Sequence, residues 1–109
     1  MTGIARGIYM HREWPMGVED QAALIDIERD RVEEICQSKL IFDRDDFDDI
    51  IYGIVEDFEI PAVLYQRPNS SYSGFCLVFD SQGGGDIKGL TDKFLKLYKI
   101  PRDLVSWEP

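Results

Sequence analysis

The chain has 109 residues, of which 44% are hydrophobic, and its 21 acidic and 12 basic side chains give a formal net charge of −9 at pH 7. This composition predicts a single folded domain spanning residues 1–109, because so short a chain has no room for a second core. The negative charge disfavours direct binding to nucleic acid and to anionic membrane surfaces.

Apolar runs in the sequence are short. None approaches the roughly 18–20 residues that a membrane span needs, and the N-terminal residues lack the apolar core of a secretion signal. The two cysteines, Cys36 and Cys76, have no metal-binding or redox spacing, which favours reduced thiols in the core. We therefore expect a cytosolic protein with no membrane partner.

The acidity is concentrated in one half of the chain. Residues 13–60 hold sixteen Asp and Glu against four Lys and Arg, a local balance of −12. A field of this sign raises the encounter rate with a positively charged partner.

The predicted elements begin with a short strand at 4–10, where β-compatible residues are bounded by Gly3 and Pro15. A long helix over 18–38 follows, because apolar residues recur on one side of a helical wheel. This stripe consists of Val18, Ala22, Ile25, Val32 and Cys36. Ile27 falls off the stripe, so it is either solvent-exposed or a sign that the helix is interrupted.

A second helix is predicted over 43–59. Asp43 is a suitable N-cap, Phe42 and Phe47 have the spacing of a hydrophobic staple, and Pro61 prevents the helix from continuing. Its apolar stripe consists of Phe47, Ile50, Ile51, Ile54 and Phe58. We expect this stripe to face a core.

The segments 61–67 and 74–80 are rich in β-forming residues, and the turn formers at 68–73 connect them. This pattern predicts a β-hairpin. The second segment is apolar without alternation, which indicates a central strand covered on both faces.

A third helix is expected after Asp86, which is a suitable N-cap, and Pro101 ends it. The tail that contains Trp107 is expected to add an edge strand or to pack its indole against the sheet.

Together these elements predict an α+β fold in the order β-α-α-β-β-α-(β). We expect a small, mainly antiparallel sheet of three to four strands covered by about three helices. The predicted core consists of Val18, Ile25, Val32, Phe47, Ile51, Ile54, Phe58, Val63, Phe75, Leu77, Phe79, Leu90, Phe94 and Leu97.

Five carboxylates lie on or beside one outward strip of the predicted helix at 43–59. They belong to Asp45, Asp46, Asp49, Glu56 and Asp57. Like charges at helical spacing repel one another, so a strip without interspersed Lys is either a merely solvated face or a docking surface for a basic partner.

The same carboxylates do not form a calcium-binding motif. Counting from Asp43, an EF-hand loop needs Gly where Asp48 stands and Glu where Ile54 stands. No His or Cys lies close enough in sequence to suggest a transition-metal site. We predict neither a metal nor another cofactor.

The loop at 83–88 joins a predicted strand to a predicted helix and contains Gly83, Gly84, Gly85 and Lys88. Glycines before a helix N-terminus can form a cradle for phosphate. The spacing matches neither the P-loop nor the dinucleotide-binding motif, so a flexible connector is favoured over a ligand loop.

No catalytic residue is predicted, since the single histidine, His11, has no nucleophile at a recognisable spacing. Our leading hypothesis is a non-catalytic acidic module that inhibits or regulates a basic partner. Its most concrete form is an immunity protein or antitoxin that blocks a nuclease or another nucleic-acid-acting enzyme. The alternatives are a small-ligand or enzymatic domain that uses residues 83–88, and a homo-oligomeric subunit joined through exposed apolar residues such as Ile27 and Trp107.

Overall fold

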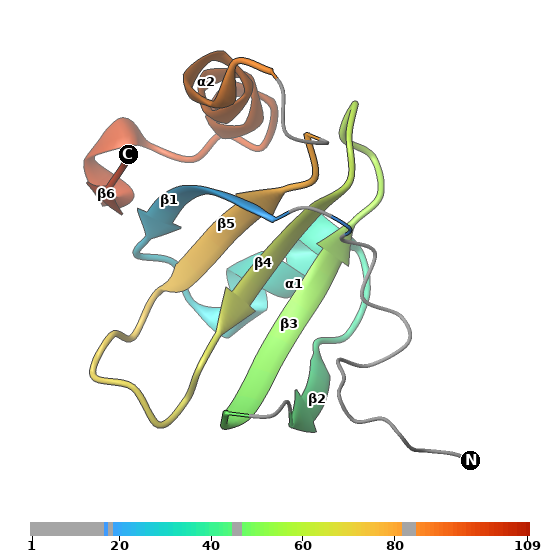
Figure 1. The fold of residues 1–109 in the computed structure, drawn as a ribbon, viewed down its shortest axis with the longest axis vertical. Coiled ribbons are helices and arrows are strands. Elements are labelled where there is room, and N and C mark those ends of the chain that lie inside the picture. Colours follow the sequence, from blue (N-terminus) through green and yellow to red (C-terminus); the bar gives the residue numbers. More distant parts are fainter. Residues whose placement is uncertain (1–16, 18, 45–46, 82–84) are drawn as a thin grey trace.

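The described part of the chain forms one six-stranded antiparallel sheet with two α-helices (Figure 1). The computed structural model describes residues 17, 19–44, 47–81 and 85–109, so the predicted strand at 4–10 lies outside it. The elements are β1 Asp20–Ile25, α1 Arg29–Cys36, β2 Ile41–Arg44, β3 Asp49–Val55, β4 Ala62–Gln66, β5 Phe75–Phe79, α2 Ile87–Leu97, the 3-10 helix η1 Arg102–Leu104, and β6 Val105–Trp107.

The strand order is β2-β3-β4-β5-β1-β6, with β2 and β6 at the two edges. The predicted sheet of three to four strands under about three helices, in the order β-α-α-β-β-α-(β), is therefore wrong in its strand number, helix number and order. Two predicted helices account for the error.

The first of these is the helix predicted over 18–38, whose described part divides into β1 and α1. Residues 22–25 form an apolar run that fits a strand, and β1 pairs with both β5 and β6. Ile27 is 6% exposed in the loop that follows. Its position off the helical stripe thus marked a real interruption, and the alternative of an exposed Ile27 is wrong.

The second is the acidic helix predicted over 43–59, whose described part consists of the end of β2, residues 47–48, β3 and the loop after β3. Residues 49–55 are mostly β-branched or aromatic and favour a strand. Their side chains alternate between the two faces of the sheet, and both faces are buried. A strand buried on both sides carries apolar residues at nearly every position, so helical spacings match it by coincidence. Phe47, the supposed staple residue, is 86% exposed.

The hairpin and the third helix were predicted correctly. β4 and β5 are antiparallel neighbours, and β5 is buried along its whole length in the interior of the sheet. α2 is capped by Asp86, whose side chain accepts a hydrogen bond from the Gly89 amide at 3.1 Å. The tail forms the short edge strand β6.

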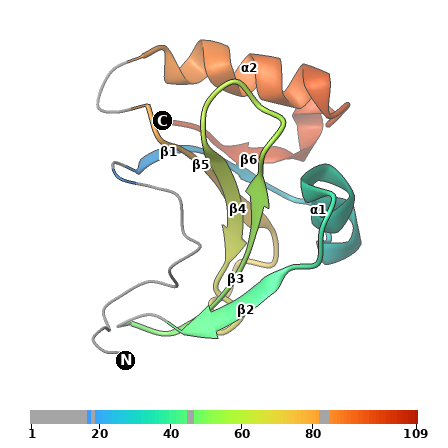
Figure 2. The same ribbon diagram turned by 90° about the vertical axis from the view of Figure 1, so that its right-hand side faces the viewer.

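Both helices pack on the same face of the sheet (Figure 2). Val32 and Ile35 of α1 and Phe94 of α2 belong to one buried cluster together with Phe75 and Phe79 of β5. A second cluster on the opposite face includes Ile50, Tyr52, Val63, Cys76 and Val78. In the predicted core, Phe47 and Leu97 are exposed, Val18 lies outside the described residues, and the others are buried or partly buried.

Candidate functional site

The structure does not bring the predicted acidic residues together. Asp49 begins β3, whereas Glu56 and Asp57 follow its other end, roughly 20 Å away along an extended strand. Asp49 pairs with Arg44 at 2.7 Å and accepts a hydrogen bond from Asn69. Asp45 and Asp46 lie outside the described residues. The single acidic strip expected from helical geometry is thus absent from the described part of the chain.

The predicted ligand loop is described only in part, because Gly83 and Gly84 lie outside the described residues. Gly85 has a φ of +121°, a value that favours glycine. Lys88 lies exposed in the first turn of α2. The carboxylate of Asp86 already occupies the N-terminus of α2, where it would compete with a bound phosphate.

A different acidic surface lies between the loop after β1, the first turns of α1 and the C-terminal segment around η1. We call it the acidic groove. It is open to solvent and has a volume of about 460 Å³, and its lining residues are Asp26, Ile27, Glu28, Asp30, Arg31, Glu34, Ile100, Pro101 and Leu104.

Hydrogen bonds to two backbone carbonyls hold the walls of the acidic groove in place. The Asp26 amide donates a hydrogen bond to the Leu104 carbonyl at 2.8 Å and so joins the end of β1 to η1. Arg31 donates to the Tyr98 carbonyl and thereby ties α1 to the C-terminus of α2. Ile27 and Ile100 are each 6% exposed and give the groove an apolar floor.

Carboxylates line the acidic groove in excess. Four carboxylates face one guanidinium, a local charge of −3, and Arg31 pairs with Glu34 at 3.3 Å. Among the residues that the structure describes, none forms an ion pair with Asp26, Glu28 or Asp30, and all three are exposed. The acidic groove thus combines unneutralised negative charge with an apolar floor.

Sequence reasoning missed the acidic groove because it assigned residues 18–38 to one long helix and so did not predict a loop between β1 and α1. The alternation Asp26-Ile27-Glu28 was the available signal, since it sets an apolar residue between two acids at the point where the helical stripe fails. The groove is complete only because residues 100–104 pack beside this loop. That contact joins distant parts of the chain, so sequence spacing does not reveal it.

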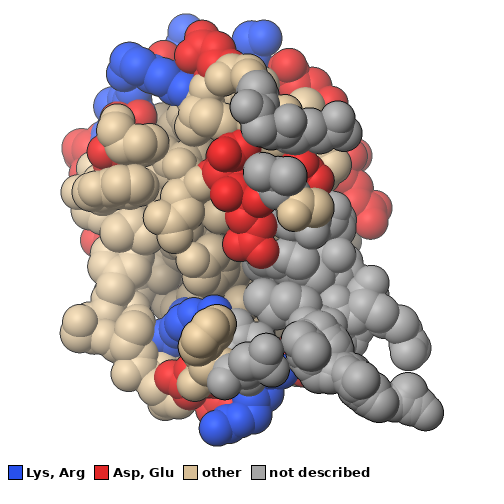
Figure 3. Space-filling model, in the orientation of Figure 1, with Lys and Arg blue, Asp and Glu red and all other residues tan. Residues whose placement is uncertain are grey.

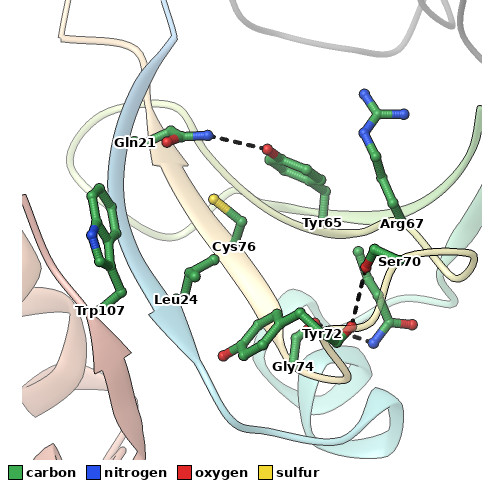
Figure 4. Close-up of a pocket in the computed structure, with 10 residues that line it drawn as sticks. Gln21, Leu24, Tyr65, Arg67, Ser70, Tyr72, Gly74, Cys76 and Trp107 are labelled. Carbon is green, nitrogen blue, oxygen red and sulfur yellow. Dashed lines mark hydrogen bonds between the residues drawn. The ribbon is translucent and has the colours of Figure 1, made fainter. Parts of the chain in front are cut away.

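A second concavity lies on the sheet face opposite the helices, and we call it the aromatic pocket (Figure 4). It encloses about 310 Å³. Its lining residues are Gln21, Leu24, Tyr65, Gln66, Arg67, Ser70, Tyr72, Gly74, Cys76 and Trp107. On this face, the described surface over β1 and β5 is largely free of charged groups, and acidic side chains gather where β1 begins and β5 ends (Figure 3).

Tyr65 and Cys76 lie side by side at the base of the aromatic pocket. Gln21 donates a hydrogen bond to the Tyr65 hydroxyl at 3.4 Å. Burial raises the pKa of Tyr65 to about 12, and the neighbouring Cys76 adds to the shift. Burial also raises the pKa of Cys76. Both groups are therefore protonated at neutral pH, and Cys76 is a poor nucleophile there.

Neither concavity presents metal-binding chemistry. No group of three His, Cys, Asp or Glu in the described ranges is arranged to hold a metal ion. Cys36 and Cys76 are free and buried, as predicted. Within those same ranges, neither helix is long and apolar enough to cross a membrane.

No family model, no curated protein and no solved structure matches this chain.

Proposed function

We propose that this chain is a non-catalytic binding module that takes a basic protein partner in the acidic groove. Its most concrete form is a cytosolic inhibitor of the immunity-protein or antitoxin type, which blocks a nuclease or another nucleic-acid-acting enzyme. The observation that carries the proposal is the set of three exposed carboxylates, Asp26, Glu28 and Asp30, around an apolar floor.

The chemistry of the groove fits a Lys or Arg side chain. Such a side chain has an apolar stem below a charged head, so the stem can cover Ile27 and Ile100 while the head reaches the carboxylates. An uncharged partner would leave these acids near an apolar surface without compensation. Charge complementarity of this kind contributes mostly to specificity and to the rate of association.

The overall charge supports an enzyme that acts on nucleic acid as the partner. Such enzymes carry positive surfaces that attract phosphates, and a domain with a net charge of −9 is drawn to the same surfaces. A compact anionic domain bound there would exclude the nucleic acid by charge and by volume.

Two charge-matched double variants test the proposal. Asp26→Asn/Glu28→Gln removes two charges from the acidic groove, and Glu56→Gln/Asp57→Asn removes two from the loop after β3. All four residues are exposed, so both variants should fold. The immobilised wild-type protein is first used to capture basic proteins, which are eluted at high salt. The rate at which each variant associates with the captured protein is then measured over a range of salt concentrations.

We expect the groove variant to associate about fivefold more slowly at low salt and to depend less on salt, because it has lost part of the steering field. The variant at Glu56 and Asp57 should retain most of the rate. An equal loss of association rate in both variants would contradict the proposal, because it would show that the net charge, and not the acidic groove, determines the rate. The absence of any salt-eluted basic protein would also contradict the proposal.

A further inference from the structure

We propose that the aromatic pocket binds a small planar aromatic molecule that is neutral or carries one negative charge. This inference is independent of the acidic groove, because the two concavities share no lining residue.

Ring surfaces from three separate elements form the walls of the aromatic pocket. Trp107 comes from β6, Tyr65 from β4, and Tyr72 from the loop between β4 and β5 (Figure 4). Leu24 of β1 and Cys76 of β5 complete an apolar base. Mostly apolar walls with a few polar groups are typical of small-molecule sites, and flat walls favour flat ligands through stacking contacts.

Hydrogen bonds position the walls before any ligand arrives. The Tyr72 hydroxyl and the Ser106 hydroxyl lie 3.0 Å apart, which joins the β4–β5 loop to β6. Gln66 donates to the carbonyls of Ser73 and Gly74 at 2.6 Å and 3.1 Å. A preformed pocket loses little conformational entropy when it binds a ligand.

Gly74 shows how closely the loop packs against the sheet. A Cβ atom at this position would lie 2.4 Å from the Ile25 carbonyl oxygen and 2.5 Å from the Tyr72 hydroxyl oxygen. Any larger residue would therefore displace Tyr72 from the wall, so glycine is required for the shape of the aromatic pocket.

Gln21 provides the polar contact that would orient a ligand. Its amide nitrogen donates to Tyr65, which leaves its carbonyl oxygen able to accept a hydrogen bond from a ring N–H or hydroxyl of the ligand. Gln21 is itself exposed, so it lies where an entering molecule can reach it.

The charge of the lining residues determines which ligand charge is favoured. The protein has a net charge of −9, yet among the described residues that line the aromatic pocket there is no Asp or Glu, and Arg67 is the only charged one. Arg67 lies close enough to lower the pKa of Tyr65 against the larger effect of burial. Glu19 is not a lining residue, although its charge contributes to the raised pKa of Cys76 after the larger effect of burial. A carboxylate on a ligand ring can pair with Arg67, whereas the described lining residues offer no carboxylate to an ammonium group, so a neutral or anionic ring is favoured.

Three probes of equal ring size test the proposal by NMR titration of the full chain: indole, indole-3-acetate and tryptamine. We expect saturable shifts of the Trp107 indole N–H and the Gly74 amide with indole and with indole-3-acetate. Tryptamine should bind about threefold or more weakly than indole, because its ammonium group meets Arg67. Non-saturable shifts, shifts centred elsewhere, or tightest binding by tryptamine would overturn the proposal.

Variants locate the binding to the aromatic pocket. Trp107→Ala should weaken indole binding about tenfold, since it removes one wall. Phe42→Ala is the matched control, because Phe42 is an exposed aromatic residue on β2 at the opposite edge of the sheet. Gln21→Ala tests the polar contact at an exposed position and should weaken indole binding about threefold. Unchanged affinity in both Trp107→Ala and Gln21→Ala would overturn the proposal.

Discussion

A Cβ atom placed on Gly53 of β3 would lie 2.6 Å from the Cys36 Sγ atom of α1, a distance that real Cβ atoms essentially never show. The helix therefore contacts the sheet directly at this point. Leu40, which follows α1, also lies 3.3 Å from the same position. The absence of a side chain at Gly53 thus allows α1 to pack closely on β3.

Gly53→Ala should accordingly lower the free energy of unfolding by about 1–3 kcal/mol, because the added methyl group overpacks a buried contact. Urea denaturation measures the loss. Cys36→Ala removes the sulfur atom, so the double variant should lose less than the sum of the two single losses, with a coupling of about 0.5 kcal/mol or more. Strict additivity would show that Cys36 and Gly53 do not constrain each other.

Asp86 acts on a residue nearby in sequence, whereas Gly53 acts on a distant one, and only the first kind of contact can be predicted from the sequence. Asp86 acts on the amide three residues later, so its role as a cap is a local property and was predicted correctly. The hairpin was equally predictable, because its turn formers and apolar strands are contiguous. Gly53 stands in a strand whose two faces contact different elements, and no local pattern encodes those contacts.

The two candidate sites also depend on contacts that no local sequence pattern encodes. The acidic groove needs Asp26 near Leu104, and the aromatic pocket needs Tyr65 near Trp107, so both depend on contacts between distant parts of the chain. The sequence did predict an acidic surface in the half that contains Asp26. The acidic strip predicted over 43–59 is not continuous, because Asp49 and Glu56 lie at opposite ends of a doubly buried strand that was interpreted as an amphipathic helix.

Alkaline pH should destabilise the protein through its buried thiols. Burial raises the pKa of Cys36 from 9.0 to about 12, so between these values the folded state keeps a proton that the unfolded state releases. The unfolded state then binds fewer protons, and the free energy of unfolding falls as the pH rises. Tyr65, whose pKa is raised to about 12, adds to the fall above pH 10.

Urea denaturation at pH 8, 9 and 10 measures this dependence. Cys36→Ala should show a shallower fall than the wild-type protein, since it lacks one of the shifted groups. Cys76→Ala measures the share of the second thiol, whose pKa burial also raises. An unchanged slope in the Cys36→Ala variant would contradict the assignment.

Asp86→Ala should cost about 1 kcal/mol of stability, because the Gly89 amide at the start of α2 loses its hydrogen-bond acceptor. Asp86→Asn should restore most of the loss, since its side-chain oxygen can accept the same bond. Lys88→Ala is the control in the same turn, as Lys88 is exposed. Thermal denaturation distinguishes the three variants, and equal losses at Asp86 and Lys88 would argue against a capping role.

The hydroxyl group of Tyr98 should contribute nothing to stability, although its ring does. The hydroxyl oxygen is buried and has no hydrogen-bond partner among the described residues. The ring packs against Phe94 with centroids 4.7 Å apart, and the hydrogen bond from Arg31 goes to the backbone carbonyl of Tyr98. A phenylalanine side chain would preserve both contacts.

Tyr98→Phe should therefore leave the free energy of unfolding unchanged or raise it by up to about 1 kcal/mol, because it removes a buried polar group without a partner. Tyr72→Phe is the matched control and should lose about 0.5–1 kcal/mol, since the Tyr72 hydroxyl is bonded to Ser106. Denaturation of both variants under identical conditions gives the comparison. A larger loss at Tyr98 than at Tyr72 would mean that the Tyr98 hydroxyl is hydrogen-bonded in the folded protein.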